Sequence, residues 1–134
     1  MFKRTPYSEL NSRQKENYNF QKVAGLLADY GFNCLRLTDD WKGADFIACH
    51  INGSTYLKIQ LKGRLVIDRK YEGKDIYIAF FDGDECFVYP HDDFIQHAVK
   101  LGSIEGSKSW DDVGSYSWPS PPKWAAAFLA NWGI

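Results

Sequence analysis

Three side chains in the first half of the chain have the types and spacing of a metal-assisted hydrolytic site: Asp45, Gln60 and Lys62. Mg²⁺ prefers octahedral oxygen ligands, and proteins typically supply one or two carboxylates and leave waters in place. The Asp45 carboxylate, the Gln60 amide oxygen and the main-chain carbonyl of Leu61 would be such ligands. Lys62 would orient or deprotonate a metal-bound water, or stabilise the charge of a pentacovalent phosphate. The alternative is a structural ion pair of Asp45 with Lys62 at a strand end, bridged by Gln60.

A predicted β-hairpin brings these residues together. Asn52-Gly53 separates two strand-like runs, which is a strong signal for a two-residue turn with positive φ at both positions. Such a turn pairs residues whose numbers sum to 105, as 52 and 53 do, so Asp45 faces Gln60. Because side chains alternate along a strand, Lys62 shares their face of the sheet.

The remaining elements predict an α+β protein with a central mixed, mostly antiparallel sheet of four to five strands flanked by helices. An apolar stripe at helical spacing predicts an amphipathic helix over 11–30, capped by Asn11 or Ser12 and ended by Gly31. Predicted strands cover 32–37, 44–51, 54–62, 75–81 and 85–89; a polar loop covers 38–43, an irregular segment 102–122, and helices 92–100 and 123–132.

Composition limits the class of protein. The 134 residues are 45% hydrophobic and 25% charged, which is typical of a globular chain. We expect one domain, 1–134, with a core over about 11–100 and a Trp-rich extension over about 101–134. No apolar stretch is long enough to cross a bilayer, and the first residues have no apolar signal core, so we expect a cytoplasmic protein without membrane contact. The sequence contains no glycine-rich phosphate loop, serine-hydrolase elbow or zinc-ligand spacing.

Charge is unevenly distributed along the chain. The total of 16 basic and 17 acidic residues argues against a strong non-specific nucleic-acid binder. However, residues 58–74 carry six basic and two acidic residues, and residues 1–22 carry five and two. These segments flank the candidate site in sequence, as phosphate-contacting residues would. The candidate nucleic-acid-binding residues are Arg13, Lys58, Arg64, Arg69 and Lys70; the alternative is a solvated charged loop.

The C-terminal region is rich in aromatic residues. Trp124, Phe128 and Trp132 recur at helical spacing, and this stripe is expected to pack the last helix against the sheet. The alternative use of these rings is stacking on unpaired bases.

The order helix, strand, Asp, hairpin and Q-x-K resembles the core of the PD-(D/E)xK nuclease superfamily, which includes restriction enzymes and Holliday-junction resolvases. The resemblance rests on Gly43-Ala44-Asp45-Phe46 and on the run from Ile59 to Arg64, and it covers residues 11–90. It implies a restriction-endonuclease-like α/β core and a Mg²⁺- or Mn²⁺-dependent endonuclease that hydrolyses phosphodiester bonds in DNA. A chain with one such centre would cut both strands as a homodimer.

Gln60 departs from the family pattern, and Glu16 is the candidate for a further residue that the family often has. Gln60 stands where the family usually has an acidic residue, which removes one negative charge from the metal site. The family often has a glutamate on the first helix, and Glu16, one turn before Phe20 on the apolar stripe, is the candidate for it. The resemblance thus implies Asp45, Gln60, Leu61 and Glu16 as metal ligands, with Asp45, Gln60, Lys62 and Glu16 as the catalytic set. The alternative for Glu16 is a solvated side chain that suits the helix dipole.

Two other functions remain open at this point. The missing second acid would suit a nuclease-like module that binds nucleic acid or a protein partner without cleavage. The Trp-rich tail would suit an intracellular interaction domain.

Overall fold

A computed structural model of the chain describes residues 1–102 and 109–134, without the side chains of Asp40, Trp41 and Ser109. The helices are α1 (Ser12–Ala28), α2 (His91–Lys100) and α3 (Lys123–Leu129); the strands are β1 (Phe32–Trp41), β2 (Ala44–His50), β3 (Tyr56–Leu61), β4 (Leu65–Asp68), β5 (Ile76–Asp82), β6 (Glu85–Pro90) and β7 (Ser115–Trp118); single helical turns are η1 (Tyr7–Glu9), η2 (Arg69–Tyr71) and η3 (Ser109–Val113). None of the helices in these described ranges is long and apolar enough to span a membrane.

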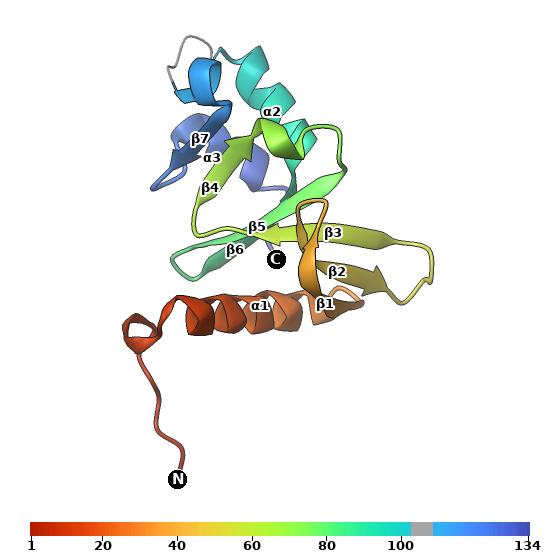
Figure 1. Cartoon of the computed structure of the whole chain (residues 1–134), viewed down its shortest axis with the longest axis vertical. Coiled ribbons are helices and arrows are strands. Elements are labelled where there is room, and N and C mark those ends of the chain that lie inside the picture. Colours follow the sequence, from red (N-terminus) through yellow and green to blue (C-terminus); the bar gives the residue numbers. More distant parts are fainter. Residues whose placement is uncertain (103–108) are drawn as a thin grey trace.

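Five strands form the main sheet, in the order β1-β2-β3-β5-β6. Neighbouring strands are antiparallel except β3 and β5, which are parallel. Figure 1 shows α1 on one side of this sheet and β4, β7, α2 and α3 on the other. One apolar cluster joins α1 to the sheet, and a second joins the sheet to the other helices. The predicted α+β class with a mixed, mostly antiparallel sheet is confirmed.

Helix α1 confirms the predicted N-terminal helix. The Asn11 side chain accepts a hydrogen bond from the Gln14 N–H, and the Gln14 side chain accepts one from the Asn11 N–H, both at 2.9 Å, which is a capping box. Val23 and Leu27 are buried against the sheet. The helix was predicted to extend to residue 30, but it ends at Ala28, and Tyr30 is exposed.

The register of the β2–β3 hairpin is confirmed, although its turn differs from the prediction. The pairs run from Phe46–Ile59 to Cys49–Tyr56, and each sums to 105. The loop comprises the four residues 51–54, of which only Gly53 has positive φ. A four-residue loop preserves the register of a two-residue loop because it removes one residue from each strand.

The two-residue turn with positive φ at both positions lies between β1 and β2. Lys42 and Gly43 have φ of 54° and 91°, and Trp41 pairs with Ala44 across the turn. The predicted polar loop over 38–43 is therefore wrong, because β1 continues through Trp41. Lysine seldom adopts positive φ, so turn preferences favoured a longer loop.

A second sheet of two antiparallel strands, β4 and β7, was missed in the sequence. β7 interrupts the segment 102–122 that was predicted to be irregular, of which 103–108 lie outside the described residues. Leu65, Val66 and Ile67 of β4 are buried, and the Tyr89 hydroxyl donates to the Val66 carbonyl at 2.6 Å. The Val66 N–H in turn donates to the same hydroxyl at 3.2 Å, which links this sheet to β6.

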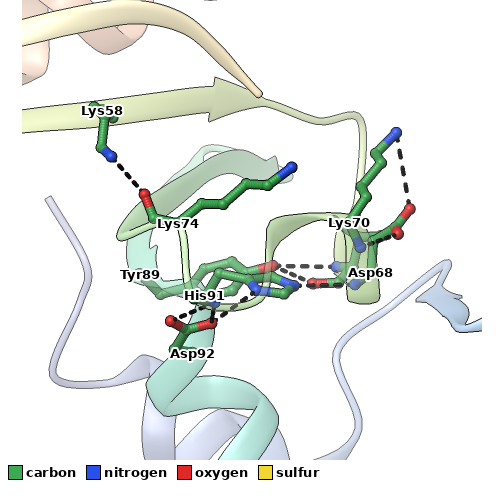
Figure 2. A network of polar contacts seen from close by, with 9 residues as sticks. Lys58, Asp68, Lys70, Lys74, Tyr89, His91 and Asp92 are labelled. Atoms are coloured by element: carbon green, nitrogen blue, oxygen red, sulfur yellow. Dashed lines mark hydrogen bonds and ion pairs between the residues drawn. The ribbon is translucent and has the colours of Figure 1, made fainter. Parts of the chain in front are cut away.

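His91, the first residue of α2, is completely buried. Its Nε2 accepts a hydrogen bond from the Asp68 N–H at 3.0 Å, so the neutral ring carries its proton on Nδ1. Nδ1 lies 3.7 Å from Asp92 Oδ1 and has no hydrogen-bond partner in the described part of the chain (Figure 2). Burial lowers the pKa of His91 despite the nearby carboxylates, and the imidazole is therefore neutral at pH 7.

The C-terminal aromatic residues pack against the core as predicted, although the helix predicted over 123–132 ends at Leu129 and Trp132 lies beyond it. Trp124, Phe128 and Trp132 are partly buried against the second apolar cluster, and the Trp124 ring stacks on Phe94 with centroids 5.8 Å apart. Trp110 is buried in the same cluster. These rings therefore serve the core that holds α3 in place.

Candidate active site

The β2–β3 ladder ends at the candidate site, where the Asp45 side chain replaces a main-chain acceptor. Hydrogen-bonded pairs alternate in an antiparallel ladder, so a continued ladder would direct the Leu61 N–H to the Ala44 carbonyl. The Leu61 N–H instead donates to Asp45 Oδ2 at 2.8 Å. This bond holds the carboxylate against the main chain of the Q-x-K segment. Asp45 and Gln60 thus lie where the regular pairing stops.

Strand β1 is irregular directly opposite Asp45. Its register shifts after Arg36, and the next four residues, 37–40, lie opposite only Asp45 of β2. Extra residues in one strand of a pair bend that strand and redirect its side chains. Residues 37–39 consequently line the same cavity as Asp45.

A cavity of about 920 Å³ is formed by α1, β1, the start of β2 and the end of β3. Its lining residues are Arg13, Glu16, Asn17, Asn19, Arg36, Leu37, Thr38, Asp39, Asp45, Gln60, Leu61, Lys62 and Gly63. The four residues predicted as the catalytic set, Glu16, Asp45, Gln60 and Lys62, thus line one cavity. Three of the lining residues are basic and three are acidic, so their formal charges cancel.

Lys62 rests on a buried aromatic ring. Its main-chain N–H donates to the Ala79 carbonyl of β5 at 2.9 Å, which fixes the backbone just beyond β3. Its Nζ lies 5.4 Å from the centroid of the Tyr71 ring, and Tyr71 is only 2% exposed. Burial raises the pKa of Tyr71, so the phenol remains protonated and neutral at pH 7. A neutral ring supports the ammonium through a cation–π contact without neutralising it.

The β1–β2 turn approaches the same ring from another side. A Cβ at Gly43 would lie 3.0 Å from Cδ1 of Tyr71, so only glycine fits there without displacing the ring. The turn that leads into Asp45 and the ring that supports Lys62 are therefore packed against each other.

The five residues predicted to contact nucleic acid do not lie together, and only Arg13 lines the cavity. Arg13 lines the cavity, and Arg64 is exposed just beyond Gly63. Lys58 donates to the Lys74 carbonyl, whereas Lys70 lies 3.8 Å from Asp68 (Figure 2). The Arg69 guanidinium lies 4.7 Å from the centroid of the Trp110 ring. Lys58, Arg69 and Lys70 are therefore not part of the cavity lining, and their binding role stays a prediction.

Several cavity residues were not singled out in the sequence. Arg36 donates a hydrogen bond to the Asn17 side chain of α1, and its guanidinium lies 5.4 Å from the centroid of the Phe20 ring. Arg36 comes from the regular part of β1, where it pairs with Phe46, and the irregularity after it brings residues 37–39 to the cavity. Asn17 carried a usable signal, because it lies four residues after Arg13 and therefore on the same face of the helix.

The donor atoms of the cavity fit a hard divalent cation such as Mg²⁺ or Mn²⁺. Asp45 and Glu16 provide carboxylates, Gln60 an amide oxygen and Leu61 a main-chain carbonyl. The described residues that line the cavity include no histidine or cysteine. No group of three His, Cys, Asp or Glu residues in the described ranges is arranged to hold a metal ion. Mg²⁺ is commonly bound through one or two carboxylates with waters and substrate phosphates, and this donor set suits that mode.

Protein-family models give no match to this chain, and neither do curated proteins. Among solved structures, the chain is similar to a Holliday junction resolvase of the archaeal hyperthermophile Archaeoglobus fulgidus, at 22% identity and a TM-score of 0.45, over 57% of this chain and 72% of the resolvase. It is also similar to a bacterial homing endonuclease, at 21% identity and a TM-score of 0.47, over 63% and 69% of the two chains. These likenesses in fold assign no role to any residue of this chain.

Proposed function

We propose that this protein is a metal-dependent endonuclease that hydrolyses phosphodiester bonds in DNA. The observation that carries the proposal is the single cavity lined by Glu16, Asp45, Gln60 and Lys62, with the Asp45 carboxylate held by the Leu61 N–H. These are the residue types that the resemblance to the PD-(D/E)xK superfamily implies, and they come from one helix and two strand ends.

A bound Mg²⁺ or Mn²⁺ would supply Lewis acidity and lower the pKa of a coordinated water. Asp45, Glu16, Gln60 and the Leu61 carbonyl are the groups that would hold it. Hydrolysis adds water across one P–O bond, and negative charge grows on the phosphoryl oxygens as the bond breaks. The Lys62 ammonium is the cavity group suited to stabilise that charge.

The cationic side chains around the cavity would position the substrate. Arg13 and Arg36 line it from α1 and β1, and a guanidinium matches the geometry of phosphate oxygens. The formal charges of the lining cancel, so a divalent cation would make the site positive. We therefore expect DNA to bind at the cavity more tightly when the metal is present.

The experiment is cleavage of plasmid and branched DNA in Mg²⁺ or Mn²⁺. Asp45→Asn keeps an acceptor for the Leu61 N–H but removes the charge, and Lys62→Met keeps much of the chain length but removes the ammonium. Each is expected to lower the cleavage rate at least about 100-fold. Lys123→Met is the matched control, at an exposed lysine outside the cavity, and should cleave normally. Cleavage that survives in both cavity variants would refute the proposal.

A second candidate function is DNA binding without cleavage. The observation that favours it is the donor set itself, because Gln60 replaces an acid and no group of three His, Cys, Asp or Glu in the described residues could hold a metal. Salt-sensitive DNA binding by a wild-type protein that never cleaves, in either metal, would select this candidate.

A further inference from the structure

A second cavity of about 580 Å³ adjoins the candidate active site and is rich in tyrosine. The two cavities share Asn19, Lys62 and Gly63 in their linings. The second cavity differs in character, because three aromatic residues, Tyr7, Tyr18 and Phe81, line it. Lys22 and Lys62 are its basic lining residues, and Asp84 is its acidic one. A molecule bound at Lys62 can therefore extend directly into it.

Helix α1 supplies one wall of this tyrosine groove. Tyr18, Lys22 and Leu26 recur every four residues along α1 and line the groove, whereas Arg13 and Glu16 line the active-site cavity. Asn19, which lines both cavities, donates to the Tyr7 hydroxyl at 3.0 Å. This bond links η1 to α1, so both tyrosines are held on the same side as the active site.

The tyrosine rings are exposed and close together. Tyr7 is 42% exposed and Tyr18 is 40% exposed, and their centroids lie 5.2 Å apart in an edge-to-face arrangement. Lys15 lies 5.3 Å from the centroid of the Tyr7 ring, and Lys22 lies 5.3 Å from that of Tyr18. Exposed aromatic rings interleaved with flexible ammonium groups combine the two features that bind single-stranded nucleic acid, base stacking and phosphate attraction.

We propose that this groove binds unpaired nucleotides next to the scissile phosphate, so that the substrate is DNA with a single-stranded segment beside the cut. Bases of that segment stack on Tyr7 and Tyr18, and Lys22 contacts their phosphates. A fully paired duplex cannot offer an unstacked base to these rings without paying to open a base pair. This proposal rests on the proposed nuclease function for the position of the cut, but binding in the groove can be measured without cleavage.

The test compares a blunt DNA duplex with the same duplex carrying a single-stranded thymidine tail, by fluorescence anisotropy in EDTA so that no cleavage occurs. Wild-type protein is expected to bind the tailed duplex more tightly. Tyr18→Leu should weaken tailed-duplex binding about 5- to 150-fold and leave blunt-duplex binding unchanged, because stacking alone is lost. Tyr18→Phe should bind like wild type. Tyr56→Leu is the matched control, since Tyr56 is 58% exposed and lies outside the groove.

Equal affinity of the wild-type protein for the two duplexes, or an equal loss on both in Tyr18→Leu, would overturn the proposal. A second measurement on the wild-type protein needs no substitution: photo-cross-linking of a tail that contains 5-iodouracil should label the peptide of Tyr7 or Tyr18. Cross-links confined to other peptides would also overturn it. Tail preference with correct cross-links but no cleavage in Mg²⁺ or Mn²⁺ would uphold the groove and refute the nuclease.

Discussion

Replacing Gly43 with alanine tests whether the β1–β2 turn supports the candidate site. Gly43 has φ of 91°, and a Cβ there would lie 3.0 Å from Cδ1 of the buried Tyr71 ring. The same ring lies under the Lys62 ammonium. Gly53→Ala is the matched control, because Gly53 has φ of 74° but no atom of the described residues, apart from its chain neighbours, lies within 4 Å of its Cβ position. The control has the backbone strain without the steric clash.

The expected losses in the free energy of unfolding can be estimated separately. A non-glycine residue in the left-handed region costs about 1–2 kcal/mol, and the lower entropy of the unfolded alanine chain offsets about 0.4–1 kcal/mol of it. Gly53→Ala should therefore cost about 0–1.6 kcal/mol. Gly43→Ala adds overpacking against Tyr71 and should cost about 1–3 kcal/mol more than Gly53→Ala.

Urea unfolding of both variants gives the two free energies directly. Thermal unfolding should agree, with Tm lowered by about 3–5 °C for each kcal/mol in a chain of this size. Gly43→Ala should also slow DNA cleavage more than Gly53→Ala does, because a displaced Tyr71 no longer supports Lys62. Equal losses of stability in the two variants would refute the packing of the turn against Tyr71.

Three further predictions concern the metal site and the buried histidine. Gln60→Glu should lower the Mn²⁺ concentration for half-maximal binding, measured by calorimetry, by about tenfold or more because it adds a carboxylate to the donor set; unchanged binding would exclude Gln60 as a ligand. Glu16→Gln should weaken Mn²⁺ binding, whereas Glu9→Gln, at an exposed site outside the cavity, should not; equal effects would place Glu16 outside the metal site. Burial holds the pKa of His91 below its unfolded value near 6.5. The stability that the neutral imidazole contributes is therefore complete above pH 6.5. It is lost as the pH falls, by at most about 1.4 kcal/mol per pH unit. The free energy of unfolding in urea should depend less on pH below pH 6.5 for His91→Gln than for wild type. Identical pH profiles would contradict the claim that the buried, neutral His91 causes this pH dependence.

Local patterns predicted the hairpin because short-range rules determine it. Whether the loop has an odd or an even number of residues decides which residues of the two strands share a face of the sheet. Alternation along the second strand then places Lys62 on the same face as Gln60. The turn prediction was wrong in detail, yet the register survived because the actual loop, 51–54, has the same centre as the predicted one and removes one residue from each strand. The apolar stripe of α1 was predictable for the same reason, since helical spacing shows its buried face directly.

The pairing of β4 with β7 and the irregularity in β1 were not predicted, because both depend on long-range packing. β4 is only four residues long and pairs with β7, about fifty residues later in the chain, so neither strand has a local partner. The irregularity in β1 has no glycine or proline to signal it within 37–40. Its position is determined by the β1–β2 turn at Lys42, a residue that seldom has positive φ.

These long-range features change how the site is expected to bind DNA. The basic segment 58–74 flanks the site in sequence and was predicted to contact phosphates there. In the structure, Lys58, Arg69 and Lys70 contact other groups, and Lys62 alone of the basic residues in this segment lines the cavity. Arg13 and Arg36 provide the remaining positive charge from outside that segment. Because three acidic residues balance these three cations, phosphate attraction at the cavity depends on a bound metal ion, whereas the tyrosine groove binds through stacking. Salt should therefore weaken binding of a blunt duplex more steeply in Mn²⁺ than in EDTA.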